Sequence, residues 1–298
     1  MRAFIIMFVT RVHSIPFKNI FSCWNARLLS ALRKNPLRVR AFIIALVFGM
    51  VVACQSFGAP PRSTEILWDT YGVPHIYGKD VRSAFYAFGW AQMQSHGNLL
   101  LRLYGQARGR GAEYWGEEYL DSDKWTLTMG VPSRASSWYK AQNPTFRSYL
   151  DGFAEGINAY VKENPNLIDD SVEVVLPVKG EDVLAHLQRV LHFTFMVNPE
   201  QVLGISKQKS KAGSNGWSIA PKRSASGNAM LLANPHLPWS DLFLWYEAQI
   251  TAPGIDAYGA SLVGIPVLNI AFNDNLGWTH TVNTHDGWDA YELSKRGD

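Results

Sequence analysis

The sequence predicts a mixed α+β fold, in which helices from the first half of the chain cover a sheet from the second half. Three observations support this prediction. Apolar residues recur at helical spacing in long segments before residue 197. After residue 213, short apolar segments follow one another and are separated by turn signals such as Ser226-Gly227-Asn228. The 298-residue chain is 47% hydrophobic and 18% charged, which is typical of a globular protein.

The charge of the chain is divided unevenly. The formal net charge is +3, but residues 1–58 hold eight of the 28 basic residues and none of the 25 acidic ones. The remainder is therefore acidic overall, which argues against a nucleic-acid-binding surface. Both cysteines, Cys23 and Cys54, also lie in residues 1–58, so neither a disulfide framework nor a cysteine metal site is expected elsewhere.

Residues 1–58 are interpreted as an export leader. Basic residues at 33–40 precede an apolar run at 41–53, which is typical of a signal peptide and too short to span a membrane. The run ends at Val51-Val52-Ala53-Cys54, which resembles a bacterial lipoprotein signal whose cysteine is acylated. The alternative is an export signal that is cut nearby without lipid. Both interpretations place the mature protein outside the cytoplasm, in the periplasm.

Two short strands are expected at the start of the globular part. Residues 64–68 and 73–77 are rich in β-forming side chains and flank a turn at Tyr71-Gly72. Pro74 predicts an edge position for the second strand, because proline has no N–H to donate to a sheet.

Helices are expected between these strands and residue 197. Apolar residues fall on one stripe over 81–103, over 146–161 and over 180–191. Pro144 precedes the second helix, and acidic residues lie in the first turn of the third. The stripes are interpreted as core, so residues 59–197 form a helix-rich segment.

Residues 214–298 are expected to be rich in strands. Their short apolar segments lie at 217–220, 230–233, 242–250, 266–272 and 278–282. This succession predicts a largely antiparallel sheet.

A hydrophilic segment at 198–213 separates the two halves and is interpreted as a spacer. It ends at Gly213, and a cut between Gly213 and Ser214 would leave Ser214 as a new N-terminus. A serine hydroxyl needs a base to become a nucleophile, and a free α-amine titrates at roughly 7.7–8, close to the best value for a base at neutral pH. Taken alone, the Gly-Ser-Asn sequence is weak evidence for this cut, and an ordinary linker turn is the alternative. His75 and His192 are interpreted as packing or surface residues.

Further motifs in both halves point to a known family. In the first half they are Tyr71-Gly72-Val73-Pro74-His75-Ile76, Gly89-Trp90-Ala91-Gln92, Gly109-Arg110-Gly111-Ala112-Glu113 and Gly152-Phe153-Ala154-Glu155-Gly156-Ile157-Asn158. In the second half they are Ser214-Asn215-Gly216-Trp217, Ala233-Asn234-Pro235-His236-Leu237, Gly259-Ala260-Ser261, Gly264-Ile265-Pro266 and Gly277-Trp278-Thr279-His280-Thr281-Val282. Over residues 64–293 the chain resembles the penicillin acylase family, and more narrowly its acyl-homoserine-lactone acylase branch.

The resemblance implies an N-terminal-nucleophile hydrolase with a four-layer αββα core, formed when a precursor cuts itself into α and β chains. By position, Ser214 matches the nucleophile, with Gly213 and Ser214 flanking the autocleavage bond. His236 matches a residue that hydrogen-bonds near the nucleophile. Val282 matches the position whose backbone N–H donates to the oxyanion, a contribution on the order of 3–4 kcal/mol.

The resemblance also bears on metal binding. Asp286, Trp288 and Asp289 match a structural calcium site of penicillin acylases, with two carboxylates and a backbone carbonyl as oxygen ligands. No cofactor is required for catalysis. Zinc is the alternative at His280 and His285, but their spacing on a strand and turn does not place both on one face.

Two departures from the family pattern stand out. His96 occupies a position where the family usually has Asp, which affects packing more than chemistry. The sequence ends at Asp298, whereas the family's β chain continues much further and there supplies the second oxyanion donor. The chain is therefore expected to be a fragment or a truncated product.

The expected function is self-processing hydrolysis of an N-acylated small molecule, most specifically an acyl-homoserine lactone. The expected assembly is an α/β heterodimer from one precursor, with lipid anchoring at Cys54. A penicillin- or cephalosporin-type acylase, an inactive truncated envelope protein and a zinc hydrolase are the alternatives.

Overall fold

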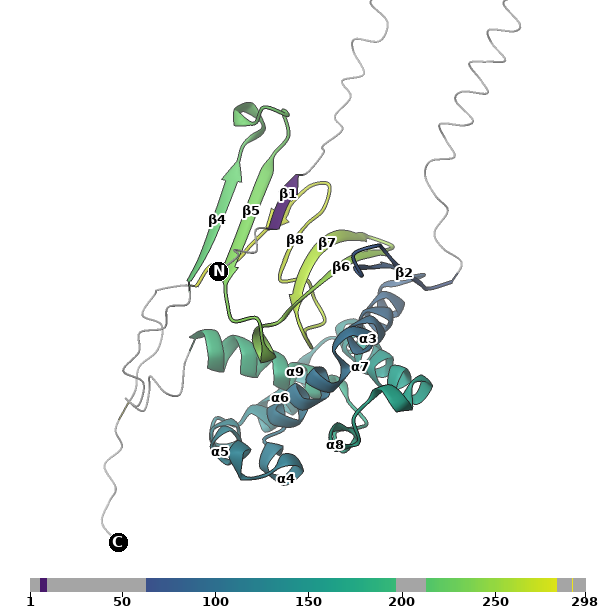
Figure 1. Ribbon diagram of the computed structural model, residues 1–298, viewed down its shortest axis with the longest axis vertical. Coiled ribbons are helices and arrows are strands. Elements are labelled where there is room, and N and C mark those ends of the chain that lie inside the picture. Colours follow the sequence, from purple (N-terminus) through teal and green to yellow (C-terminus); the bar gives the residue numbers. More distant parts are fainter. Residues whose placement is uncertain (1–5, 10–62, 197–212, 283–290, 292–298) are drawn as a thin grey trace, which may run out of the picture. The chain divides into compact units, whose positions relative to one another are not determined.

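Most helices precede residue 197 and most strands follow residue 213, so the predicted α+β class is confirmed (Figure 1). The computed structural model describes residues 6–9, 63–196, 213–282 and 291. The helices are α3 (Val81–Ala107), α4 (Gly111–Trp115), α5 (Leu120–Thr128), α6 (Val131–Ala141), α7 (Pro144–Glu163), α8 (Asp170–Glu173) and α9 (Gly180–Val190). The strands are β1 (Ile6–Val9), β2 (Glu65–Trp68), β3 (Pro74–Tyr77), β4 (Gly213–Ile219), β5 (Met230–His236), β6 (Trp245–Ala252), β7 (Ile255–Leu262), β8 (Ile270–Phe272) and β9 (Gly277–Trp278). None of the described helices is long and apolar enough to cross a membrane.

The described strands form two sheets. One has six strands in the order β2-β3-β6-β7-β8-β9, and the other has three in the order β1-β5-β4. Every pair among them is antiparallel except β3 with β6. The edge position expected from Pro74 is wrong, because β3 lies between β2 and β6. Pro74 is the first residue of β3, and the ladder with β6 begins one residue later at His75, so the missing N–H falls outside that ladder.

The strand expected over 266–272 is shorter in the structure. Only Ile270–Phe272 pairs with β7, because the chain first makes a turn after Leu262. The backbone N–H of Asn269 donates to Ala260 O (2.8 Å), and Asn269 Oδ1 accepts from the N–H of Leu262 (3.0 Å). These two bonds close the connection between β7 and β8.

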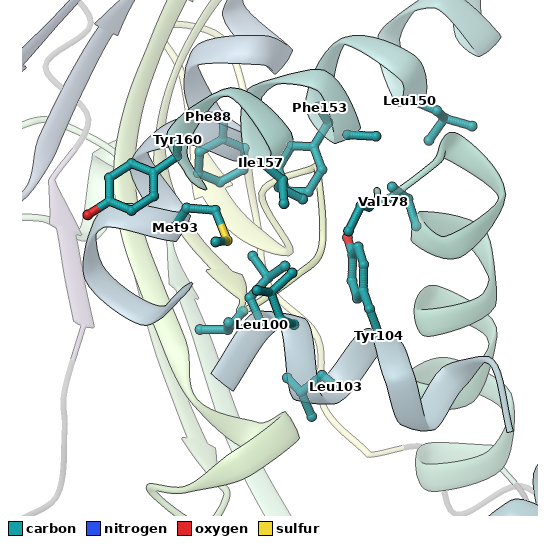
Figure 2. Packing of buried hydrophobic residues seen from close by; sticks show 14 of the residues in the cluster. Phe88, Met93, Leu100, Leu103, Tyr104, Leu150, Phe153, Ile157, Tyr160 and Val178 are labelled. Atoms are coloured by element: carbon teal, nitrogen blue, oxygen red, sulfur yellow. The ribbon is translucent and has the colours of Figure 1, made fainter. Parts of the chain in front are cut away.

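Helices α3 and α7 form the centre of the helical part. Figure 2 shows Phe88 of α3 beside Phe153 and Ile157 of α7, with the two phenyl rings 5.9 Å apart between centroids. Two glycines let the helices approach this closely. A Cβ on Gly89 would lie 2.2 Å from Phe153 O, and a Cβ on Gly156 would lie 1.9 Å from Tyr86 O. Any side chain at these positions would force the helices apart.

Helix α3 is kinked at His96, whose φ of −142° is not helical. Tyr246 of β6 donates its hydroxyl to Ala91 O (2.9 Å), a carbonyl in the turn just before the kink. The His96 ring packs edge-on against the Tyr246 ring at 5.8 Å. The residue that departs from the family pattern thus has a packing role, as the sequence predicts.

A second contact joins the helices to the β7–β8 connection. Three buried side chains, Gln92 and Tyr104 of α3 and His186 of α9, hydrogen-bond the backbone of residues 263–265, here called the 263–265 turn. Gln92 Nε2 donates to Ile265 O (3.1 Å) and its Oε1 accepts from Gly264 N (2.8 Å), Tyr104 Oη donates to Gly264 O (2.8 Å), and His186 Nε2 donates to Val263 O (3.0 Å). A buried turn must find such partners for its peptide groups, because water cannot reach them.

The surroundings of His186 keep its imidazole neutral. Its Nε2 faces a carbonyl oxygen and therefore carries the proton, while Nδ1 is buried without a hydrogen-bond partner among the described residues. Burial lowers the pKa of His186 to about 3, and the nearby positive charge of Arg189 acts in the same direction. The ring of Tyr104 lies 5.3 Å from the imidazole.

Acid is expected to destabilise the fold through His186. The imidazole pKa is 6.5 when unperturbed and about 3 in the folded chain, so the unfolded state binds one more proton between these values. The stabilisation is therefore complete above pH 6.5 and is lost as the pH falls towards 3, by up to about 1.4 kcal/mol per pH unit. Urea unfolding between pH 4 and 7 measures this slope. In His186→Gln, which keeps an N–H donor but does not titrate, the slope should drop by about one proton, and an unchanged slope would contradict the assignment.

An ion pair anchors the start of α9 to the end of α3. Arg108 Nε and Nη2 donate to the two carboxylate oxygens of Asp182 at 2.7 and 2.8 Å, and Arg108 Nη1 donates to Val175 O (2.7 Å). Asp182 also accepts from the N–H of Lys179 and so caps its own helix. The Arg108 and Asp182 side chains are only 18% and 12% exposed, so water solvates each charge poorly and each depends on the other for stabilisation.

Asp182→Ala is expected to lower the free energy of unfolding by about 3–5 kcal/mol, because it leaves the Arg108 guanidinium buried without its counter-charge. Glu113→Ala is the matched control, since it removes the carboxylate of an exposed arginine pair and should cost less than about 1 kcal/mol. Chemical denaturation of the two variants makes the comparison. Equal losses would show that burial of the Arg108–Asp182 pair has no energetic consequence.

Candidate active site

Ser214 is the second residue of β4 and is held in a strand ladder. The sequence predicted a strand only from residue 217, but β5 pairs with β4 along its whole length, from Ile219 back to Gly213. Ser214 faces Pro235 across this ladder, and its side chain is partly buried. The candidate nucleophile is therefore fixed by the sheet.

The Ser214 hydroxyl lies against the peptide bond that is expected to be cut. Its Oγ donates to the carbonyl oxygen of Gly213 at 2.7 Å. In the continuous chain the Ser214 nitrogen is a peptide N–H and has no lone pair to act as a base. The α-amine that the predicted mechanism requires comes into existence only when the Gly213–Ser214 bond is broken.

His236 lies across the ladder from Gly213. Its Nδ1 is 3.4 Å from the point that a Cβ on Gly213 would occupy, and its Nε2 is 3.1 Å from Asn234 Nδ2. An amide NH₂ group is a donor, so Nε2 accepts and the neutral ring carries its proton on Nδ1, on the side of Gly213. The histidine that the family resemblance singled out is thus placed beside the bond that precedes Ser214.

Ser214 lines a cavity of about 390 Å³. The cavity wall also contains Val282, so the structure brings together two of the three predicted catalytic residues. His236 is not part of the wall that the described residues form. The remaining lining residues are Leu191, His192, Phe195, Met196, Pro235, Leu237, Trp245, Leu262, Asn269, Ile270, His280 and Thr281. A mostly apolar wall around the Ser214 hydroxyl suits a substrate with a hydrophobic group next to the bond that reacts.

One wall of this cavity was not predicted from the sequence. Helix α9 continues as a π-helical segment over Leu191–Met196, and four of these residues line the cavity. Leu191, which the helical stripe assigned to the core, is instead 40% exposed, and Met196 is 60% exposed. The signal of this wall in the sequence was the group of large apolar residues after residue 190, namely Leu191, Phe193, Phe195 and Met196. His192, interpreted as a packing or surface residue, contacts the Trp138 ring and also borders the cavity.

A second cavity of about 320 Å³ adjoins the first. The two cavities share Pro235, Leu237 and Trp245 in their walls. Glu247 is the acidic residue in the second wall, and its Oε1 accepts from the Tyr258 hydroxyl at 2.7 Å. Together the cavities offer an apolar space that extends beyond the immediate surroundings of Ser214.

The predicted metal and lipid sites lie outside the described residues. This holds for Asp286, Trp288 and Asp289, for His285 and for Cys54. Within the described part of the chain, no group of three or more His, Cys, Asp or Glu side chains could hold a metal ion. Calcium binding at Asp286, Trp288 and Asp289 therefore stays a prediction.

Comparisons with known proteins found several sequences similar to this chain. The penicillin amidase family profile matches residues 63–298. The chain is 31% identical to the acyl-homoserine lactone acylase PvdQ of Pseudomonas putida KT2440 over 290 residues, which is 85% of this chain and 37% of that protein. It is 24% identical to the acyl-homoserine lactone acylase QuiP of Pseudomonas aeruginosa PAO1, over 79% of this chain and 35% of that protein. The chain thus spans little more than a third of the length of these relatives.

Among solved structures, the chain is similar to a thermostable penicillin G acylase from Alcaligenes faecalis. The TM-score is 0.41 and the sequence identity is 22%, over 48% of this chain and 80% of that one.

Leu191→Glu is expected to weaken binding of a medium-chain fatty acid such as decanoate by about tenfold or more, because it places a carboxylate in an apolar wall. Calorimetric titration of the full chain measures this affinity. The matched control is Leu167→Glu, which makes the same change at an exposed leucine that does not border the cavity. Equal affinities in both variants would show that the acyl chain binds elsewhere.

Proposed function

Because the chain belongs to the penicillin amidase family, we propose that its protein hydrolyses N-acylated small molecules, with Ser214 as an N-terminal nucleophile. The observation that carries this proposal is the position of the Ser214 hydroxyl, in the wall of an apolar cavity and 2.7 Å from the Gly213 carbonyl oxygen. Members of this family are processed into α/β heterodimers and act on acylated small molecules.

Maturation is the first proposed step. The Ser214 Oγ attacks the Gly213 carbonyl carbon, the peptide bond is converted into an ester, and water hydrolyses that ester. The products are a chain that ends at Gly213 and a chain that begins with the free amine of Ser214. In this proposal His236 takes part in the step, which is supported by its Nδ1 on the side of Gly213 and by the contact of its opposite nitrogen with Asn234.

Catalysis then uses the new amine. It takes the proton of the Ser214 hydroxyl while Oγ attacks the substrate amide, and it returns that proton to the leaving amine. The backbone N–H of Val282, at the rim of the same cavity, donates to the oxyanion. Water hydrolyses the acyl-serine ester and releases the carboxylic acid.

The proposed substrate is an acyl-homoserine lactone. The relatives named above bear that activity in their names, and two adjoining apolar cavities suit an aliphatic acyl chain. A free energy of about 0.8 kcal/mol for each buried CH₂ group would make chain length a strong determinant of affinity. Export to the periplasm through residues 1–58, with acylation at Cys54, and calcium binding at Asp286, Trp288 and Asp289 belong to the same proposal.

Ser214→Ala is expected to abolish both maturation and hydrolysis. The rate of release of homoserine lactone from N-decanoyl-homoserine lactone should fall by at least about 10³-fold, since the nucleophile is removed. Intact-mass measurement and N-terminal sequencing should find a chain that begins at Ser214 only in the parent protein. The matched control is Ser218→Ala, which changes an exposed serine on the same strand.

Two outcomes would contradict the proposal. Hydrolysis that survives Ser214→Ala but is lost with a chelator would indicate a metal hydrolase. Turnover of a phenylacetylated amine with no turnover of the decanoyl lactone would retain the nucleophile but replace the substrate class.

A further inference from the structure

The two walls of the Ser214 cavity come from distant parts of the chain. One wall is the π-helical segment Leu191–Met196 that follows α9. The other contains Leu262, Asn269 and Ile270, which flank the 263–265 turn. Because these walls come from separate segments of the chain, tertiary contacts set the distance between them.

The 263–265 turn is rigidly connected to the second wall. Asn269 Oδ1 accepts from the N–H of Leu262, so the two ends of the connection are tied together. The Ser261 hydroxyl donates to Ile265 O at 2.9 Å and closes the turn from the strand side. Any shift of the turn would therefore move Leu262 and Asn269 with it.

Helix α9 is in turn connected to both walls. It continues directly into Leu191–Met196, and one turn before that segment His186 donates to Val263 O. Val190 packs in one buried cluster with Leu262 and Ile265. The same helix thus carries the first wall and contacts the connection that carries the second.

The 263–265 turn packs so closely against the helices that residue 264 has no space for a side chain. Gly264 has a φ of +84°, which disfavours any residue with a side chain, and a Cβ there would lie 2.9 Å from the His186 ring. Gln92 holds the N–H of Gly264 and the carbonyl of Ile265 together, as a neighbouring strand would. Tyr104 completes the set at Gly264 O.

We propose that Gln92, Tyr104 and His186 are positioning residues for the reaction, which set the spacing between the two walls of the acyl-binding cavity by fixing the 263–265 turn against α3 and α9. The proposal rests on the proposed function only in that the cavity is taken to bind the acyl group. These three residues precede the Gly213–Ser214 bond and the turn follows it, so after maturation the hydrogen bonds would join two separate chains.

The test is decanoate binding by the full chain in a Ser214→Ala background, where no turnover occurs. His186→Leu and Gln92→Leu should each weaken binding about tenfold, which is the effect of losing one well-placed buried hydrogen bond. His186→Gln, which keeps the N–H donor, should bind within about twofold of the parent. Gln94→Leu is the matched control, since Gln94 lies two residues from Gln92 on α3 and is exposed.

Affinity is measured by calorimetry at a temperature where circular dichroism shows each variant to be folded. Tyr104→Phe removes a single hydroxyl group and serves if a leucine variant does not fold. A residue that only stabilises the fold would lower the unfolding midpoint and leave the affinity of the folded protein unchanged. That result in all three positions would overturn the proposal, as would a parent protein that does not bind decanoate.

The same variants in the Ser214 protein separate this proposal from the proposed function. Loss of positioning should raise KM about tenfold for the decanoyl lactone and leave kcat within about twofold. If decanoate binding by the parent depends on Gln92, Tyr104 and His186 but the protein hydrolyses no acyl amide, the proposed function fails and the positioning role stands.

Discussion

The contact between the helices and the 263–265 turn is the constraint on which the arrangement of the site depends. A buried turn exposes peptide groups to an apolar interior, and each group left without a partner would cost on the order of 1–3 kcal/mol. Gln92, Tyr104 and His186 supply those partners from two helices. These bonds hold the turn, and with it the connection between β7 and β8, against α3 and α9.

The chemistry of Ser214 depends on the sheet in a different way. Strand β4 holds the residue opposite Pro235, with the hydroxyl against the Gly213 carbonyl. In the proposed function, this ordered strand presents the same hydroxyl for two successive reactions, the first on its own backbone and the second on a substrate. In the proposed mechanism, breaking one bond creates the base for the second reaction, so the uncut chain cannot perform it.

Buried polar side chains and the apolar cavity at Ser214 occupy different parts of the molecule. The buried side chains of Gln92 and His186 hydrogen-bond backbone groups, and Asp182 pairs with Arg108. These interactions fix helices and turns relative to one another. The cavity at Ser214 is instead lined mainly by apolar side chains. Neutral His186 is consistent with this arrangement, because a charged imidazole there would be buried beside Tyr104 and near the positive charge of Arg189.

The sequence by itself determined the helices α3, α7 and α9, because their apolar residues repeat with a period that needs no knowledge of partners. Its local motifs, whose order matches a family, also singled out Ser214 and Val282 as candidates, and both line one cavity in the structure. Only the tertiary structure decided that Pro74 begins an inner strand, that Leu191 faces a cavity and that Gln92 holds the backbone of Ile265. The physical reason is separation along the chain: Gln92 and Ile265 are 173 residues apart, and no local pattern at either residue specifies the other.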